Sequence, residues 1–272
     1  MLKPRLFDIV LIGAGPAGCA CAYQLVESGL TVAIIEKDIF PRDKICGDAL
    51  SADVVNQLYR MNTNLAEAFL KRNPKQVSKG VRFFAPNNKS LDIHFTNPKH
   101  KEAAGFVMKR LNFDAFFVEQ LMNVSNVSVF ENHKAIQINH QGESIVVKTD
   151  KATFQAKMII GADGANSIVN RKLSNNKIDK KHHSGGVRQY FEKVKWNDAH
   201  GLIELHFYKE IIPGYFWIFP LPENQANVGL GMLSSEISEQ NINLKQKFTE
   251  LIENHPNLKS RFKNAKPLET IK

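Results

Sequence analysis

A G-x-G-x-x-G pattern between an apolar run and a helical segment constrains the fold of this chain more than any other feature. The apolar run, residues 6–12, is rich in β-branched residues and is typical of a buried strand. Residues 16–28 follow as a predicted helix, with Pro16 suited to its first position. A second apolar run, 31–36, predicts another buried strand. This order predicts a right-handed βαβ unit and therefore an α/β fold with a parallel, Rossmann-like sheet.

The glycines of this pattern have the spacing of a dinucleotide-binding turn. Gly13 permits the tight turn, Gly15 lets the backbone approach a pyrophosphate, and Gly18 lets the helix pack closely on the strand. Glu36 ends the second strand, 18 residues after Gly18, where a carboxylate binds ribose hydroxyls. Glycines that serve only the turn are the alternative, and the pattern does not decide between FAD and NAD. We expect cofactor contacts from Gly13, Gly15, Pro16, Ala17, Gly18, Glu36 and Lys37.

A second glycine motif, G-A-D-G-A-N-S over residues 161–167, follows an apolar strand and precedes a short helix. It resembles the G-A-D-G-x-x-S segment of FAD-dependent enzymes of the aromatic-hydroxylase superfold. The resemblance implies FAD as the cofactor, with contacts from Gly161, Asp163 and Gly164 and with Asp163 near the pyrophosphate and riboflavin. A plain Asp-Gly turn is the alternative. Arg171 stands one position later than the arginine of that group, which leaves an arginine–phosphate contact open.

Residues 41–48, P-R-D-K-I-C-G-D, carry a more specific resemblance. They are similar to the P-R-x-K-x-C-G-[DG] loop of the geranylgeranyl reductase family, with flavin-dependent halogenases as looser relatives. In that family the loop passes close to the flavin ring, which implies that the thiol of Cys46 faces the substrate. An inert, partly buried thiol is the alternative. Catalytic contacts are expected from Cys46, Gly47 and Asp48.

Residues 106–114 resemble the V-x-R-x-x-F-D segment of the same family, in which the arginine meets the cofactor. This implies that Arg110 contacts FAD, and a guanidinium suits a pyrophosphate because it forks and keeps its charge. A solvent-exposed arginine at a helix N-terminus is the alternative. Arg42, in the loop described above, is expected in solvent or near a phosphate rather than in catalysis.

Residues 214–220 and 226–231 resemble the family's [YF]-x-W-x-F-P block and its A-N-V-G-x-G sequel. In a strand, alternate aromatic residues of the block project to one face and form an apolar wall. A long hydrocarbon substrate needs such a wall, since each buried CH₂ group contributes about 0.8 kcal/mol. An ordinary sheet core is the alternative. Substrate contacts are expected from Tyr215, Trp217, Phe219 and Pro220.

The net charge of +9 is local, because 171–183 and 242–272 contribute +4 each. No basic stripe is interleaved with aromatic residues, so no nucleic-acid partner is expected. No apolar run is long enough to span a membrane, and three cysteines without a secretory signal favour the cytoplasm. The pair His182-His183 lacks metal-ligand spacing, so no metal is expected. We hypothesise that attraction of the basic segments to anionic lipid brings the protein into peripheral contact with the inner membrane face.

The third FAD motif of these enzymes begins with a Gly-Asp pair, and here that pair occurs only at residues 47–48. We therefore expect the C-terminal portion of the pattern to be missing and FAD to be retained weakly by this chain alone. We expect two interleaved domains. An FAD-binding domain comprises residues 1–78 and 104–175, and a β-rich, mixed-sheet substrate domain comprises residues 79–103 and 176–272.

The resemblance implies an FAD-dependent oxidoreductase that reduces prenyl, geranylgeranyl-type C=C bonds by hydride transfer from reduced flavin N5. The partner would be an isoprenoid or lipid small molecule. The external reductant stays open between NAD(P)H and a ferredoxin-like donor. Two alternatives remain: a flavin-dependent monooxygenase or halogenase on the same fold, and a truncated, non-catalytic dinucleotide-binding fragment.

Overall fold

The computed structural model describes residues 3–95, 105–174, 179–196 and 201–272. The described residues form two packing units, each assembled from three separate stretches of chain. The first unit draws on Met1–Asp43, Tyr59–Leu70 and Arg110–Lys177, and the second on Lys44–Leu58, Lys71–Lys109 and Ile178–Lys272.

The first unit is built on a six-stranded sheet in the order β8-β2-β1-β11-β10-β9. Its parallel strands are β1 (Arg5–Ile12), β2 (Val32–Ile35), β8 (Val127–Phe130) and β11 (Thr153–Gly161). At one edge β9 (Ala135–Gln141) and β10 (Ser144–Thr149) run antiparallel. The strands predicted over 6–12 and 31–36 are confirmed as β1 and β2. β2 and the second half of β1, from Ile9 to Ile12, are buried, whereas Leu6 at the start of β1 is 72% exposed. The predicted α/β architecture with a parallel sheet is therefore confirmed.

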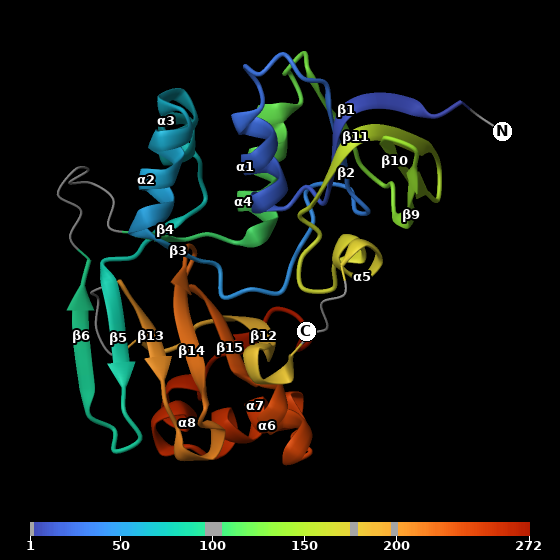
Figure 1. The fold of residues 1–272 in the computed structure, drawn as a ribbon. Helices are drawn as coiled ribbons and strands as arrows, with labels where there is room; N and C mark the ends of the chain where they lie inside the picture. The colour runs from blue at the N-terminus through green and yellow to red at the C-terminus, as the bar shows by residue number, and fades with distance from the viewer. Residues whose placement is uncertain (1–2, 96–104, 175–178, 197–200) are drawn as a thin grey trace. The chain divides into compact units, whose positions relative to one another are not determined.

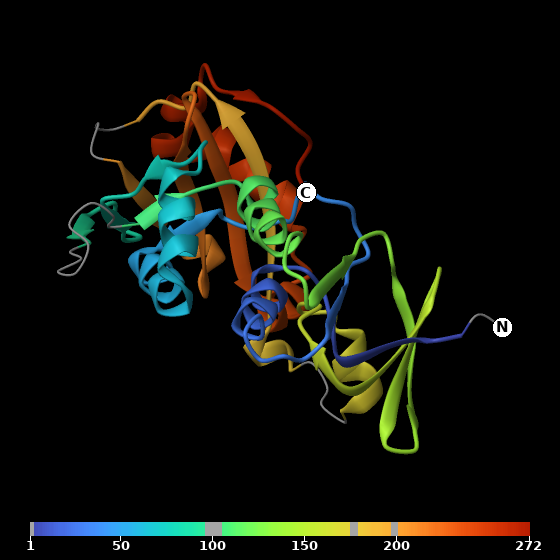
Figure 2. The same ribbon diagram turned by 90° about the horizontal axis from the view of Figure 1, so that it is seen from above.

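The helices of this unit are α1 (Pro16–Gln24), α3 (Thr63–Lys71), α4 (Arg110–Leu121) and α5 (Ile168–Leu173). Helices α1, α4 and α5 lie near its sheet, whereas α3 packs on α4 through Phe69, Phe113 and Phe116 (Figures 1 and 2). α1 and α4 lie side by side, while Ile168 and Val169 of α5 pack on the core of the sheet. The helix predicted over 16–28 ends at Gln24, because the next N–H groups bond three residues back and form turns.

The second unit is built on a seven-stranded sheet in the order β16-β12-β15-β14-β13-β5-β6. Its strands are β5 (Gly80–Phe84), β6 (Ser90–His94), β12 (Ser184–Glu192), β13 (Leu202–His206), β14 (Gly214–Leu221), β15 (Gln225–Leu233) and β16 (Lys266–Pro267). The hairpin predicted over 80–95 is confirmed as β5 and β6. A small second sheet has the order β3-β7-β4, made of Ala49–Ser51, Gly105–Val107 and Gln76–Val77. α2 (Ala52–Met61) follows β3.

The two faces of the seven-stranded sheet differ in what covers them. Phe216 and Ile218 of β14 pack with Phe248 and Leu251 in a core that includes α7 (Leu244–Asn254) and α8 (Pro256–Phe262). α6 (Ser234–Glu239) follows β15, and Figure 1 shows these three helices beside the sheet. Trp217 and Phe219 alternate to the other face and form a separate aromatic cluster. The strand pattern of β14 therefore splits its side chains between a helix-covered core and an aromatic face.

Two further features differ from the sequence expectations or bear on them. Residues 254–272, which are mostly polar, contain α8 and β16, and Leu258 and Phe262 of α8 reach the core of the second unit. The stretches 44–58, 71–78 and 105–109, expected in the FAD-binding domain, pack in the second unit, because β3 and β4 pair with β7 and Val107 of β7 packs in the cluster of Trp217 and Phe219. Domains with the expected boundaries stay a prediction. No helix of the described residues is long and apolar enough to cross a membrane.

Candidate functional site

The two glycine motifs meet at the carboxyl edge of the parallel strands in the first unit. β1 and β11 are neighbours, with Ile12 opposite Gly161. Gly13 has a φ of +101°, and a Cβ added there would lie 2.5 Å from the carbonyl oxygen of Ala162. Both its conformation and this contact exclude a larger residue. Ligands of open α/β sheets bind at this edge.

The start of α1 lies at the same edge and offers an anion site. A Cβ added at Gly18 would lie 1.9 Å from the Gly13 carbonyl oxygen, so the helix is pressed against the turn. A Cβ at Gly15 would meet nothing closer than the Arg42 guanidinium at 3.8 Å. Pro16 stands at the first helical position, with Ala17 next, and no side chain of the described residues caps the helix. The first turn carries no acidic residue, so no negative charge within that turn weakens the attraction of its N–H groups and dipole for an anion.

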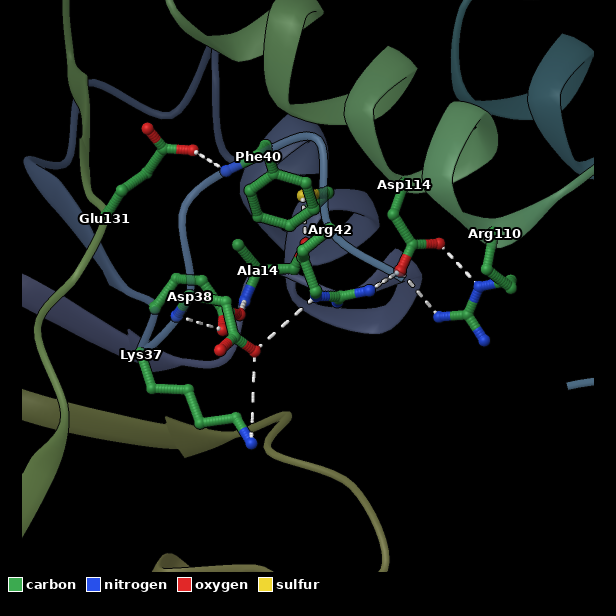
Figure 3. A network of polar contacts seen from close by, with 10 residues as sticks. Ala14, Lys37, Asp38, Phe40, Arg42, Arg110, Asp114 and Glu131 are labelled. Atoms are coloured by element: carbon green, nitrogen blue, oxygen red, sulfur yellow. Dashed lines mark hydrogen bonds and ion pairs between the residues drawn. The ribbon is translucent and has the colours of Figure 1, made fainter. Parts of the chain in front are cut away.

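Glu36 is buried and braces the glycine turn. Its Oε2 accepts a hydrogen bond from the Ala14 N–H at 2.8 Å, and its Oε1 accepts one from the Asp38 N–H at 3.1 Å. Each oxygen has a second lone pair for a ribose hydroxyl. Lys37 is exposed, and its Nζ lies 3.9 Å from Asp38 Oδ2 (Figure 3). Its side chain is therefore engaged with a surface carboxylate.

Asp163 carries an acceptor that the protein does not satisfy. Its Oδ2 accepts a hydrogen bond from the Ile168 N–H at 2.6 Å. Its Oδ1 is buried and has no hydrogen-bond partner among the described residues. Buried acceptors are rarely left unpaired, so this oxygen fits a ligand donor. The flanking glycines differ, because a Cβ at Gly161 would clash with Val169 while Gly164, at φ +78°, faces open space.

A buried carboxylate holds two arginines together beside the glycine turn (Figure 3). Arg110 donates to both oxygens of Asp114 at 2.6 and 2.7 Å, and Arg42 donates to Oδ2 at 2.5 Å. The Asp114 side chain is 0% exposed and both arginine side chains are mostly buried. Arg42 Nε also lies 3.9 Å from Asp38 Oδ2, so two guanidinium groups face two carboxylates. What this cluster offers a pyrophosphate is therefore a pair of fixed N–H donor groups.

Sequence reasoning singled out Arg110 but did not assign a role to Asp114. The i,i+4 spacing of these two residues was a readable signal, since such pairs face each other on a helix. Nothing local pairs Arg42 with Asp114, which lies 72 residues away. Arg42 is mostly buried, and its guanidinium also lies over the ring of Phe40.

Cys19 and Cys21 are not candidates for reactive thiols. Burial raises the pKa of Cys19 to about 12, and the nearby carboxylates of Asp114 and Glu36 add to the shift. Burial also raises the pKa of Cys21. A thiol with a raised pKa carries little thiolate at neutral pH and is a poor nucleophile.

The second unit contains the loop of Cys46, Gly47 and Asp48. A Cβ added at Gly47 would lie 2.7 Å from Cε2 of Phe219 and 3.6 Å from Nε1 of Trp217, so the loop backbone rests on these rings. Asp48 is fully buried, whereas Cys46 is partly exposed. The loop therefore packs directly on the aromatic face of β14.

The aromatic residues of β14 form a row. The ring centroids of Tyr215 and Trp217 lie 6.1 Å apart, and those of Trp217 and Phe219 lie 6.2 Å apart. Tyr215 is 41% exposed, whereas the other two are buried. Pro220 alternates to the opposite face, the one that carries Ile218 and Phe216.

The first unit fits FAD on its own features. Gly13 and Gly18 leave no room for a side chain, two guanidinium groups lie beside the turn, and Asp163 presents an unsatisfied acceptor. An adenine dinucleotide has a pyrophosphate for the guanidinium groups and hydroxyls for the carboxylates. The residues present therefore fit such a cofactor.

Two family models match the chain. Residues 8–171 match the family described as FAD dependent oxidoreductase. Residues 185–271 match the family described as geranylgeranyl reductase catalytic domain. The two matches cover the two glycine motifs and the aromatic strand, respectively.

Curated relatives match most of the chain at modest identity. Menaquinone reductase of Mycobacterium tuberculosis is 27% identical over 246 residues, which cover 88% of this chain and 58% of the relative. Digeranylgeranylglycerophospholipid reductase 1 of Methanopyrus kandleri is 27% identical over 244 residues, which cover 85% of this chain and 59% of the relative. The chain spans less than two thirds of the length of these relatives.

Solved structures share the fold. A geranylgeranyl bacteriochlorophyll reductase-like protein from Thermoplasma acidophilum matches with a TM-score of 0.79 and 23% identity, covering 99% of this chain and 66% of that chain. Flavin-dependent halogenases are also among the structures with this fold. The expected superfold of FAD-dependent enzymes is thus confirmed.

Proposed function

Because the chain belongs to the geranylgeranyl reductase family of FAD-dependent oxidoreductases, we propose that it binds FAD and reduces carbon–carbon double bonds of prenyl chains. The observation that carries the proposal is the row of Tyr215, Trp217 and Phe219, on which the backbone of Gly47 rests. An aromatic row without charged side chains suits a hydrocarbon, and its burial contributes about 0.8 kcal/mol per CH₂ group.

The residues of the first unit have binding roles in this proposal. The N–H groups at the start of α1 and the guanidinium groups of Arg42 and Arg110 bind the pyrophosphate. Glu36 accepts hydrogen bonds from ribose hydroxyls, and Asp163 Oδ1 accepts one from a hydroxyl of the cofactor. Bound FAD supplies hydride transfer to carbon, a reaction that no amino-acid side chain performs.

The residues of the second unit orient the substrate and exclude water. The aromatic row of β14 binds the apolar chain, and the partly exposed Cys46 borders it. Two relatives support the substrate class by their names, since one acts on a digeranylgeranyl lipid and the other on menaquinone. Both molecules combine a polar head with a long prenyl chain, which is the class of substrate that we propose.

Titration with FAD tests the cofactor part of the proposal. We expect Arg42→Ala to raise the dissociation constant about tenfold, because it removes a charge-assisted contact to phosphate. The matched control is Arg82→Ala in the second unit, whose arginine pairs with Asp92. Flavin fluorescence quenching measures both. Equal affinity of the parent chain and Arg42→Ala would contradict the assignment of Arg42.

Product analysis tests the substrate part. The FAD-loaded protein is supplied with dithionite and either a geranylgeranyl lipid or menaquinone in the absence of oxygen, and quinols are reoxidised in air before analysis. In a separate arm, the flavin is reduced until no dithionite remains, and an aromatic compound, halide and oxygen are then added. We expect products with two added hydrogens per prenyl double bond, detected by mass spectrometry. Tyr215→Ala should raise KM for the lipid about fivefold through lost apolar contact, whereas Met122→Ala, at an exposed apolar position of the first unit, should not. A halogenated or hydroxylated aromatic product alone would overturn the proposal.

We also propose peripheral contact with anionic membranes as the route to a lipid substrate. The exposed Lys172, Lys180 and Lys181 lie in the basic stretch 171–183, and each basic residue near such a surface adds about 1 kcal/mol. Flotation with anionic liposomes at low salt should recover the protein with the vesicles, and added salt should release it. Absence of binding at low salt would contradict this proposal.

A further inference from the structure

The loop of Cys46, Gly47 and Asp48 is held in a conformation that its own sequence does not favour. Asp48 has a φ of +66°, a left-handed value that glycine tolerates and other residues rarely adopt. Its carboxylate is fully buried, which is unfavourable for a charge without polar partners. Both features are stable only if several surrounding contacts hold the loop in this conformation.

One amide lies at the centre of the network that these contacts form. Asn227 of β15 is fully buried, and its Nδ2 donates to the Cys46 carbonyl oxygen and to Asp48 Oδ2, each at 2.8 Å. Its Oδ1 accepts a hydrogen bond from Trp217 Nε1 at 2.8 Å. An indole N–H only donates and a carbonyl oxygen only accepts, so these partners fix which way the amide points.

The charged neighbours of the loop lie around Tyr190 of β12. The Tyr190 hydroxyl donates to Asp48 Oδ2 at 2.6 Å. The Arg188 guanidinium carbon lies 3.8 Å and Lys109 Nζ lies 4.7 Å from the centroid of its ring. Arg188 in turn pairs with Glu269. The backbone also contributes, since the Met108 N–H donates to the Asp48 carbonyl oxygen at 2.9 Å.

These contacts separate the roles of the loop residues. The buried Asp48 and the mostly buried Tyr190 bond to each other, so neither presents its polar group to a substrate. Cys46 remains partly exposed, and the Gly47 backbone rests on the Phe219 ring. The polar network therefore fixes where the accessible part of the loop lies on the aromatic row.

We propose that Asn227 is a positioning residue that locks the Cys46–Asp48 loop onto the aromatic row through its three hydrogen bonds. The network is derived from the second unit alone, and its consequence for catalysis rests on the proposed function. Asn227 acts through the loop and through Trp217 rather than by touching the substrate. Its amide is required because neither an apolar residue nor a carboxylate supplies two donors and one acceptor here.

Hydrogen exchange at the Met108 amide tests the proposal without FAD or substrate, because this N–H is bonded to the loop itself. Asn227→Ala should lower its protection about tenfold or more, the loss expected when charge-assisted hydrogen bonds are removed. The matched control is Asn257→Ala, whose side chain is exposed and bonds to Asn88. Unchanged protection in a folded Asn227→Ala would overturn the proposal.

A pH profile separates positioning from general support of the fold. Asn227→Asp faces Asp48 with a second carboxylate, and two adjacent carboxylates share a proton at low pH and repel at high pH. Protection of Met108, corrected for the intrinsic exchange rate, should therefore be below the parent value at every pH and fall further at high pH than at low pH, where one shared proton restores a single hydrogen bond. The same loss at every pH would overturn the proposal.

Trp217→Phe provides a second test if Asn227→Ala does not fold. It removes the indole donor to Asn227 together with part of the ring that packs beside Gly229, so a loss of Met108 protection is expected, and no loss would overturn the proposal. Failure of this proposal is distinguishable from failure of the proposed function. If the parent chain reduces prenyl chains but Asn227→Ala leaves the exchange of the Met108 amide unchanged, the positioning role of Asn227 is wrong. If Asn227→Ala speeds the exchange as expected but the parent chain does not reduce prenyl chains, the proposed function is wrong.

Discussion

At the scale of single residues, Asp114 decides the electrostatics of the first unit. It is fully buried and bonds to both Arg42 and Arg110. A buried ion pair is costly to break, because the charge that remains is uncompensated. Asp114 therefore fixes two guanidinium groups that would otherwise be mobile, and the proposed pyrophosphate site depends on it.

We expect Asp114→Asn to lower the free energy of unfolding by about 3 kcal/mol, the cost of breaking a buried pair. The matched control is Asp92→Asn, whose carboxylate is 33% exposed and pairs with Arg82. That change should cost less than about 1 kcal/mol, since exposed pairs contribute little. Urea denaturation measures both, and equal costs would contradict the account of Asp114.

The two glycine variants Gly13→Ala and Gly142→Ala test the turn. Both positions have positive φ, but only Gly13 would place a Cβ at 2.5 Å from a backbone oxygen, because Gly142 faces open space. Gly142→Ala should cost about 1 kcal/mol of stability from backbone strain alone. Gly13→Ala should cost at least twice as much and abolish FAD binding. The same cost for both variants would show that the contact with Ala162 is unimportant.

At the scale of elements, α8 is tied to β13 by a buried ionic cluster. Arg261 of α8 donates to Glu204, and His206 lies 3.0 Å from the same carboxylate. Burial alone would raise the pKa of Glu204, but the bonds from His206 and Arg261 outweigh it and lower the pKa. Burial lowers the pKa of His206, in spite of Glu204.

The lowered pKa of His206 predicts a pH dependence of stability. The unfolded state takes up a proton near pH 6.5, whereas the folded state does so only at lower pH. Stability is therefore fully present above pH 6.5 and falls as the pH drops below it, by up to about 1.4 kcal/mol per pH unit. Urea denaturation at neutral and at mildly acidic pH measures this effect. We expect His206→Gln to lose part of the pH dependence of the free energy of unfolding that the parent chain shows. His182→Gln, at a side chain 85% exposed, should retain it; identical dependence in both variants would contradict the account.

Local sequence patterns predicted the elements whose partners lie nearby. β1, α1 and β2 follow from apolar runs, a proline and glycines that are close in the chain. The partners of Arg42 and Arg261 lie 72 and 57 residues away, so no local pattern reports those pairs. The polarity of residues 254–272 concealed α8, because few of its residues are apolar.

At the scale of the whole molecule, two interleaved units carry separate parts of the proposed chemistry. The first has a glycine turn that fits a dinucleotide, and the second has an aromatic row on which a loop held by hydrogen bonds rests. The motifs of both units were readable from sequence, because each is a short contiguous segment. The roles of their residues toward FAD and a prenyl chain remain proposals that the experiments above test.

A single turnover without oxygen is the most direct measurement of the central claim, that this chain is an FAD-dependent reductase of prenyl double bonds. The protein is loaded with FAD, reduced with dithionite until no reductant remains, and mixed with a geranylgeranyl lipid. The account predicts that the absorbance of oxidised flavin returns in step with a lipid product that carries two more hydrogens. Flavin that stays reduced beside an unchanged lipid, in protein with FAD bound, would contradict it.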